Sequence, residues 1–315
     1  MHKKIIILVN LLIAINLCVY AQQDPLLTHF SYNKMAINPG STGLDDGFCA
    51  TTIYRNQWDK VAGAPNSAVL NLEGNMNRYF PGGIGLNFYH DAIGFGRQNN
   101  LILNYSYPLE IGKDKLGIGL GLGILNFGMK PTWITPDNNN FDKSIPESFS
   151  ATGLDLNFGL YYQSSKRINF GISGTHLNSA NLKQSVSKGN TSYDQIYKVA
   201  KHLYIMAGYK TNPIGPGNID FQTMLRTDLN KFSVDLNAKY VLNKIGYAGL
   251  TYRTSDAIAI MCGFIPITNM TVGYSYDLTL SKLSSVSRGS HEILLKYCYY
   301  LPIPPVTVSR NPRWL

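Results

Sequence analysis

Residues 116–124 read LGIGLGLGI, so that a large aliphatic side chain stands at every second position and glycine stands between them. Because successive side chains of a β-strand point to opposite faces, one face of this segment is purely aliphatic and the other is bare backbone. A soluble sheet turns polar side chains to water, whereas a membrane-spanning strand turns aliphatic side chains to hydrocarbon. The pattern therefore predicts a transmembrane strand whose glycine face lines an interior.

The same alternation recurs along the chain in segments of about ten residues, the length of a transmembrane strand. Charges fall on the less oily face, as Asp155 does in 152–162 and as Asp235 and Lys239 do in 232–242. Fourteen such segments lie near 47–57, 65–75, 82–91, 96–109, 115–128, 152–163, 166–176, 201–211, 217–229, 231–242, 245–253, 256–266, 269–280 and 290–300. We therefore predict an all-β fold, an antiparallel transmembrane β-barrel of about 14 strands. The competing fold is a water-soluble β-sandwich, which also alternates but keeps a polar outer face.

The connections between these segments differ in length. Most turns after even-numbered strands are short, with 76–81 as the exception, whereas the long loops 129–151, 177–200 and 281–289 follow odd-numbered strands. Outer-membrane barrels have short periplasmic turns and longer outer loops. We therefore expect both termini in the periplasm and the long loops outside the cell.

The first residues have the pattern of a secretory signal peptide. Lys3 and Lys4 precede an apolar run over 5–19, and Ala21 ends a small-residue cleavage pattern. The alternative, a transmembrane anchor, needs about 20 apolar residues. We expect a signal peptide at 1–21, an N-terminal segment at 22–46, the barrel at 47–300 and a periplasmic tail at 301–315.

Composition and motifs argue against several other functions. The formal net charge of +9 is spread along the chain, which suits anionic lipid headgroups better than nucleic acid. Cys49, Cys262 and Cys298 remain after the signal peptide, and an odd number without C-x-x-C indicates neither a disulfide framework nor a zinc site. No G-x-S-x-G or H-E-x-x-H motif occurs, and His291 and Glu292 point to opposite strand faces. We expect no catalytic activity, no cofactor and no bound metal.

Several stretches resemble the PorP/SprF family of type IX secretion system membrane proteins, found in Bacteroidota. They cover most of the mature chain, and their order and spacing are more specific than any one of them. They are Gln23-Asp24-Pro25, Tyr32-Asn33, Asn38-Pro39-Gly40-Ser41-Thr42-Gly43, Tyr54-Arg55-Asn56-Gln57-Trp58, Gly83-Ile84-Gly85-Leu86 with Asp91 and Gly94, Tyr276-Asp277 with Leu283, Gly289-Ser290-His291-Glu292-Ile293, and Asn311-Pro312-Arg313-Trp314. The family more often has Ala-Tyr-Ala-Gly after Asn-Pro, so residues 40–43 are a variant.

This resemblance implies an integral outer-membrane component needed for export or surface anchoring of type IX cargo. Cargo of that system carries a C-terminal sorting domain, and in gliding bacteria it includes large adhesins. The implied partners are the secretion machinery, such cargo and outer-membrane lipid. The alternative function is a general outer-membrane channel or small-solute transporter, and a lipid-modifying enzyme is a third hypothesis.

The glycine row suggests what occupies the interior. Glycine in a strand often marks the close approach of another backbone, and fourteen strands enclose a space wider than their own side chains fill. We expect residues 24–43 to fold into the lumen as a plug; the alternative is that the glycines only permit curvature. The residues assigned to this plug and lumen are Asp24, Asn38, Pro39, Gly117, Gly119, Gly121 and Gly123.

A partner surface is expected at the outer loops. Trp133, Phe141 and Phe149 place large apolar side chains in an otherwise polar loop, as binding hot spots do, unless that loop folds on itself. The other residues assigned to partner binding are Arg55, Trp58 and Arg288 near the outer ends of strands, and Arg313 and Trp314 in the periplasmic tail.

Overall fold

The computed structural model describes residues 24–132, 147–188, 191–242 and 245–301, and these form sixteen strands and three short helices. The predicted signal peptide at 1–21 lies outside the described residues. The strands are β1 (Phe48–Asn56), β2 (Asn66–Asn75), β3 (Gly83–Ile93), β4 (Gly96–Ile111), β5 (Asp114–Met129), β6 (Phe149–Gln163), β7 (Ile168–Thr175), β8 (Asn181–Lys188), β9 (Thr191–Lys198), β10 (His202–Lys210), β11 (Gly217–Thr227), β12 (Phe232–Leu242), β13 (Gly246–Arg253), β14 (Ala257–Phe264), β15 (Met270–Thr279) and β16 (Ser290–Tyr299).

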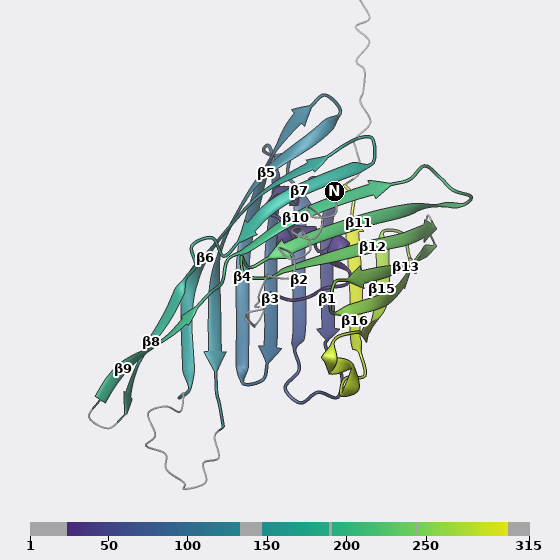
Figure 1. Ribbon diagram of the computed structural model, residues 1–315. Coiled ribbons are helices and arrows are strands. Elements are labelled where there is room, and N and C mark those ends of the chain that lie inside the picture. Colours follow the sequence, from purple (N-terminus) through teal and green to yellow (C-terminus); the bar gives the residue numbers. More distant parts are fainter. Residues whose placement is uncertain (1–23, 133–146, 189–190, 243–244, 302–315) are drawn as a thin grey trace, which may run out of the picture.

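Fourteen of these strands form one closed antiparallel barrel (Figure 1), which confirms the predicted fold class. Each strand pairs with its neighbours in chain order, β1 closes the ring against β16, and β7 pairs directly with β10. The skipped strands, β8 and β9, form a separate hairpin that extends away from the ring beside β6 (Figure 1). The prediction of a plain loop at 177–200 was therefore wrong.

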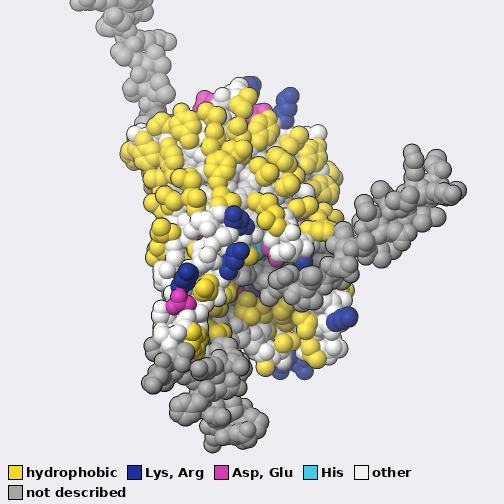
Figure 2. Space-filling model, turned by 60° about the vertical axis from the view of Figure 1, so that its left-hand side comes forward, with side chains coloured by type: hydrophobic (Ala, Val, Ile, Leu, Met, Phe, Trp, Pro, Cys, Tyr) yellow, Lys and Arg dark blue, Asp and Glu magenta, His cyan; other side chains and the backbone are white. Residues whose placement is uncertain are grey.

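The outer face of the barrel is apolar. The even positions of β5 point outward, and Leu122 and Ile124 keep 57% and 50% of their surface exposed. Leu103 on the paired strand β4 is 57% exposed as well. Figure 2 shows hydrophobic side chains covering much of one side of the molecule. Such a continuous apolar surface is unfavourable in water and suits a hydrocarbon environment.

A disulfide joins the two strands that close the ring. Cys49 on β1 and Cys298 on β16 are register partners with Cα atoms 4.1 Å apart, and they are bonded to each other. Cys262 is free and exposed. The odd cysteine count gave no reason to expect this bond, because the count cannot tell which two residues the barrel closure brings together.

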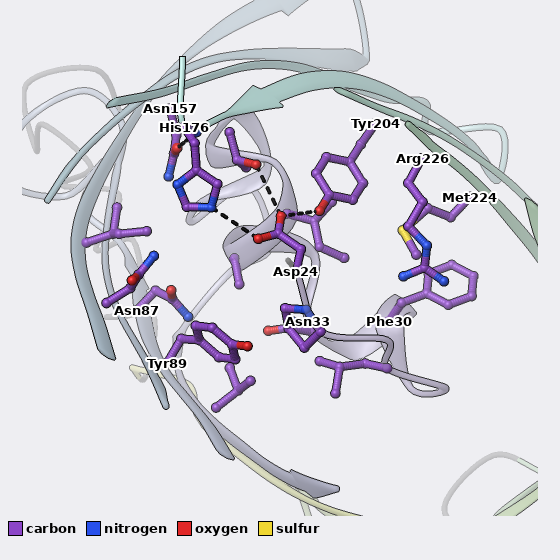
Figure 3. A pocket seen from close by; sticks show the side chains of 18 residues that line it. Asp24, Phe30, Asn33, Asn87, Tyr89, Asn157, His176, Tyr204, Met224 and Arg226 are labelled. Atoms are coloured by element: carbon purple, nitrogen blue, oxygen red, sulfur yellow. Dashed lines mark hydrogen bonds and ion pairs between the residues drawn. The ribbon is translucent and has the colours of Figure 1, made fainter. Parts of the chain in front are cut away.

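The N-terminal segment, residues 24–47, precedes β1 and lies within the ring of strands (Figures 1 and 3). It contains three short helical turns, η1 (Phe30–Tyr32), α2 (Lys34–Ile37) and η2 (Pro39–Ser41). Among the described residues, no helix has both the length and the apolar character needed to cross a bilayer.

Candidate functional site in the barrel interior

Two glycines of β5 receive the backbone of the N-terminal segment. A Cβ atom added to Gly119 would lie 2.1 Å from the carbonyl carbon of Pro39, and one added to Gly117 would lie 2.0 Å from the carbonyl oxygen of Gly40. The same oxygen accepts a hydrogen bond of 2.9 Å from Ser106 Oγ. Any larger residue at these positions would displace the segment, so glycine is required by close approach.

Gly121 and Gly123 have a different environment. The atoms nearest to an added Cβ belong to barrel residues: Asn104, Asn157 and Ile102 for Gly121, and Leu101 and Ile102 for Gly123. The predicted row of four glycines is therefore divided, with one half against the N-terminal segment and the other against neighbouring strands.

Asn38 fixes the turn of the segment against the wall. Its Oδ1 accepts a hydrogen bond from the backbone N–H of Gly40, which caps η2. Its Nδ2 donates to the carbonyl oxygens of Leu160 at 2.9 Å and Ile172 at 3.3 Å, on β6 and β7. One fully buried side chain thus forms hydrogen bonds with both the N-terminal segment and two strands of the barrel.

Two apolar clusters lie inside the barrel, and residues of the segment take part in both. Leu27 packs against Ile53, Val69, Tyr89 and Leu294, which project inward from four strands. Phe30 packs against Tyr204, Met206 and Met224. Apolar side chains that face a lumen are favourable only when something covers them, and here the segment provides the cover.

Buried charges hold the beginning of the segment. Arg55 on β1 pairs with Asp277 at 2.7 Å and Glu292 at 3.1 Å. Glu292 also accepts the backbone N–H groups of Thr28 at 2.8 Å and His29 at 2.7 Å. The carboxylate of Glu292 thus binds both the barrel wall and the N-terminal segment.

The ion pairs continue around the wall. Asp235 on β12 accepts from Arg226 at 3.0 Å and from Arg253 at 3.1 Å. Arg253 also reaches Asp277 at 3.3 Å, which links this group to the Arg55 network. All of these side chains are buried, and buried charges are tolerated because each is paired and hydrogen-bonded.

Asp24, at the start of the described chain, lies among polar side chains from the end of β7, the residue that follows it and the start of β10 (Figure 3). His176 Nε2 is 3.1 Å from Asp24 Oδ1, and Tyr204 donates its hydroxyl to Oδ2. His202 Nδ1 lies 3.4 Å from the same Oδ2. Burial by itself would raise the pKa of the Asp24 carboxyl, but His202 and His176 together hold that pKa well below its usual range.

A cavity of about 60 Å³ adjoins this cluster; its lining includes Asp24, Asn157, His176 and Tyr204 (Figure 3). A larger hollow of about 480 Å³ lies next to Asp24, on the side where the long loops emerge. Its lining includes Trp58, Asp228, Lys231 and Asp256. The local spacing of the sequence did not indicate His176 and His202 as neighbours, because the residues of β8 and β9 separate them in the chain.

The residues assigned to partner binding are not brought to one surface. Arg55 is 1% exposed and Phe149 is 5% exposed, so both are interior residues and neither is available to a partner. Phe149 begins β6, three residues earlier than predicted, and packs with Leu125 and Leu182. Trp133, Phe141, Arg313 and Trp314 lie outside the described residues.

Trp58 and Arg288 do lie close together. Trp58 is half-buried and its backbone N–H donates to Ser290 Oγ at 3.1 Å. Arg288 is exposed and its N–H donates to the carbonyl oxygen of Asp59 at 3.0 Å. The β1–β2 and β15–β16 loops are therefore joined at this rim of the barrel.

The fold and interior define the class of the protein: an outer-membrane β-barrel with a folded segment inside it. Residues 19–297 match the model of the family described as type IX secretion system membrane protein PorP/SprF, so the chain belongs to that family and is an outer-membrane component of type IX secretion. A search of curated proteins gave no match.

Solved structures with the same kind of fold are distant in sequence. The toluene transporter TbuX of Ralstonia pickettii is 11% identical with a TM-score of 0.51, over 85% of this chain and 93% of that one. The monoaromatic hydrocarbon channel CymD is 13% identical with a TM-score of 0.49, over 85% and 93%. The outer-membrane protein Omp33 of Acinetobacter baumannii is 7% identical with a TM-score of 0.46, over 82% and 100%. The likeness to TbuX shows the fold alone.

Proposed function

We propose that this protein supports export or surface anchoring of type IX cargo by binding the cargo or the secretion machinery, and that its lumen stays closed while it does so. The observation that carries this proposal is the docking of the N-terminal segment on the inner wall. Leu27 and Phe30 sit in apolar clusters, Thr28 and His29 bind Glu292, and Asn38 binds β6 and β7. A general diffusion channel would need this space for water and solute.

The surface that meets the partner is, in this proposal, the rim from which the long connections emerge. The β8–β9 hairpin and the joined loops around Trp58 and Arg288 both rise from this rim. With the termini in the periplasm, this rim faces the outside of the cell. A partner there would be a secreted protein with a C-terminal sorting domain, such as a large adhesin, and the tail with Arg313 and Trp314 would meet periplasmic machinery.

The test removes the hairpin and keeps the barrel. Residues 178–200 are replaced by a short Gly-Ser linker, which β7 and β10 tolerate because they already pair with each other directly. We expect normal amounts of folded barrel in the outer membrane and loss of cargo from the cell surface, measured by protease accessibility of the cargo on intact cells.

The matched control changes the opposite rim, where Tyr79 and Phe80 of the β2–β3 turn are exposed. Replacing both by serine should leave display unchanged. Normal display in the hairpin deletion strain would contradict the proposed partner surface. Stable conductance of the purified wild-type protein in planar bilayers would contradict the closed lumen and favour the channel.

A further inference from the structure

The cluster around Asp24 has the composition and arrangement of a metal site. Asp24, His176 and His202 each offer one ligand atom, and these atoms all lie within 4.8 Å of one another. Two imidazoles and a carboxylate are a donor set that divalent first-row transition metals accept. Asp24 belongs to the N-terminal segment, His176 is the residue directly after β7, and His202 begins β10.

The second observation is the environment of the His202 ring. Its side chain is 1% exposed, yet within the described part of the chain neither ring nitrogen has a hydrogen-bond partner. The distance of 3.4 Å between its Nδ1 and Asp24 Oδ2 is an ion-pair contact only. A buried imidazole without partners is costly, and a metal ion held jointly with Asp24 would satisfy it.

His176 is positioned as a ligand by a second layer of residues. Its Nδ1 lies 2.8 Å from Asp155 Oδ1, and its backbone N–H donates to Asn157 Oδ1 at 2.9 Å. Its backbone has φ +55°, which residues other than glycine adopt uncommonly. A carboxylate on one ring nitrogen orients the other toward the metal, as in carboxylate–histidine–zinc arrangements. Nε2 faces Asp24.

Space and charge also fit. The adjoining cavity of about 60 Å³ is larger than the roughly 15 Å³ that one water needs, so it can supply a fourth, water ligand. Two carboxyl groups contact the ring of His176, those of Asp24 and Asp155, while the nearby Arg226 is paired with Asp235. In tetrahedral zinc the ligand atoms lie about 3.3 Å apart, so closure of the site requires only small side-chain rotations.

We propose that Asp24, His176 and His202 bind a divalent first-row transition-metal ion, with zinc as the expected occupant, and that this ion ties the N-terminal segment to the barrel wall. His176 and His202 stand directly before and after the excursion that contains β8 and β9. The ion would therefore also clamp the base of that hairpin. This inference is independent of the export role.

The binding test uses the full mature protein in detergent, purified through a tag without histidine and stripped with a chelator. Titration with Co²⁺, followed by its visible absorption, and competition with Zn²⁺ should give one equivalent of bound metal. H202Q and D24N should each weaken binding by at least about tenfold, and D155N, which changes a positioning residue, by about 10- to 100-fold.

The control is H291Q, because His291 lies on β16 and contacts Tyr274 away from the cluster; it should bind metal like the wild type. Heat-modifiable gel migration confirms that each barrel is folded, and D24N supplies the test if H202Q does not fold. Wild-type protein that binds no more Co²⁺ or Zn²⁺ than H202Q would overturn the proposal and leave only an ion-paired cluster.

A second readout separates a metal tie from a merely structural cluster. Zinc at 100 times its dissociation constant should slow tryptic cleavage at Lys34 by up to about 100-fold, because it stabilises only the docked segment. H202Q should lose this protection, and H291Q should keep it. Cleavage of the wild-type protein that does not change with zinc would show that no such tie exists.

Discussion

Gly119 gives the sharpest test of how the N-terminal segment is held. In Gly119→Ala the new Cβ would stand 2.1 Å from the carbonyl carbon and 2.3 Å from the carbonyl oxygen of Pro39. Ordinary contact begins at 3.4 Å, so the segment must retreat by more than an ångström at this point. Both neighbours are backbone atoms and cannot turn aside. Overpacking of this kind costs about 1–3 kcal/mol.

This cost should fall on docking of the segment, because β5 is fixed on both sides by β4 and β6. The undocked population then rises by about 5- to 150-fold. Tryptic cleavage at Lys34, followed by mass spectrometry on the folded barrel, reports that population when opening is fast relative to cleavage. The rate should rise by the same factor.

Gly128→Ala on the same strand is the matched control. The nearest atoms to its added Cβ are 3.7 Å and 3.9 Å away, so it introduces alanine into β5 without overlap. It should be cleaved at the wild-type rate. Equal cleavage of the Gly119 and Gly128 variants would refute the docking of Pro39 and Gly40 on this strand.

Three further predictions concern stability, measured as urea midpoints of the protein in lipid vesicles. Arg55→Met should destabilise by about 3–5 kcal/mol, because it leaves the buried Glu292 without its arginine and leaves Asp277 paired with Arg253 alone, whereas the exposed Arg288→Met should change little; equal midpoints would contradict the interior network. Serine at both Cys49 and Cys298 should cost about 2–4 kcal/mol, because their bond closes the ring, whereas Cys262→Ser should be neutral; no difference between them would count against the bond. Leu103→Arg, at the middle of β4, should cost about 2–4 kcal/mol by placing a charge in hydrocarbon, with Leu103→Ala as the milder control; an arginine variant as stable as wild type would argue against lipid at this face.

Much of the barrel could be predicted from the sequence, because alternation is a local property. The exposed Leu122 and the buried Gly121 follow from a period of two and the rule that apolar side chains of a transmembrane barrel face lipid. The β8–β9 hairpin could not be predicted in the same way. It lies outside the ring, and among its described side chains only Leu182 and Val186 are buried and apolar.

The interior was harder to predict, because its contacts join residues far apart in the chain. Arg55 was placed on a partner surface, although it shares its strand face with Ile53, which is fully buried. Cys49 and Cys298, and likewise His176 and His202, meet only after the strands are ordered. A sequence gives the face of each strand but not which faces meet across the lumen.

The apolar residues of the interior bear most directly on function. Ile53, Val69 and Leu294 project into the lumen, contrary to the rule that a barrel's inner face is polar, and Leu27 covers them. Met206 and Met224 are covered by Phe30 in the same way. Withdrawal of the segment would expose these side chains to water at about 25 cal/mol per Å², in addition to breaking the hydrogen bonds to Glu292. The inner wall of a water-filled channel is lined by polar side chains instead. The presence of these apolar side chains therefore argues that the wall and the N-terminal segment form one folded unit.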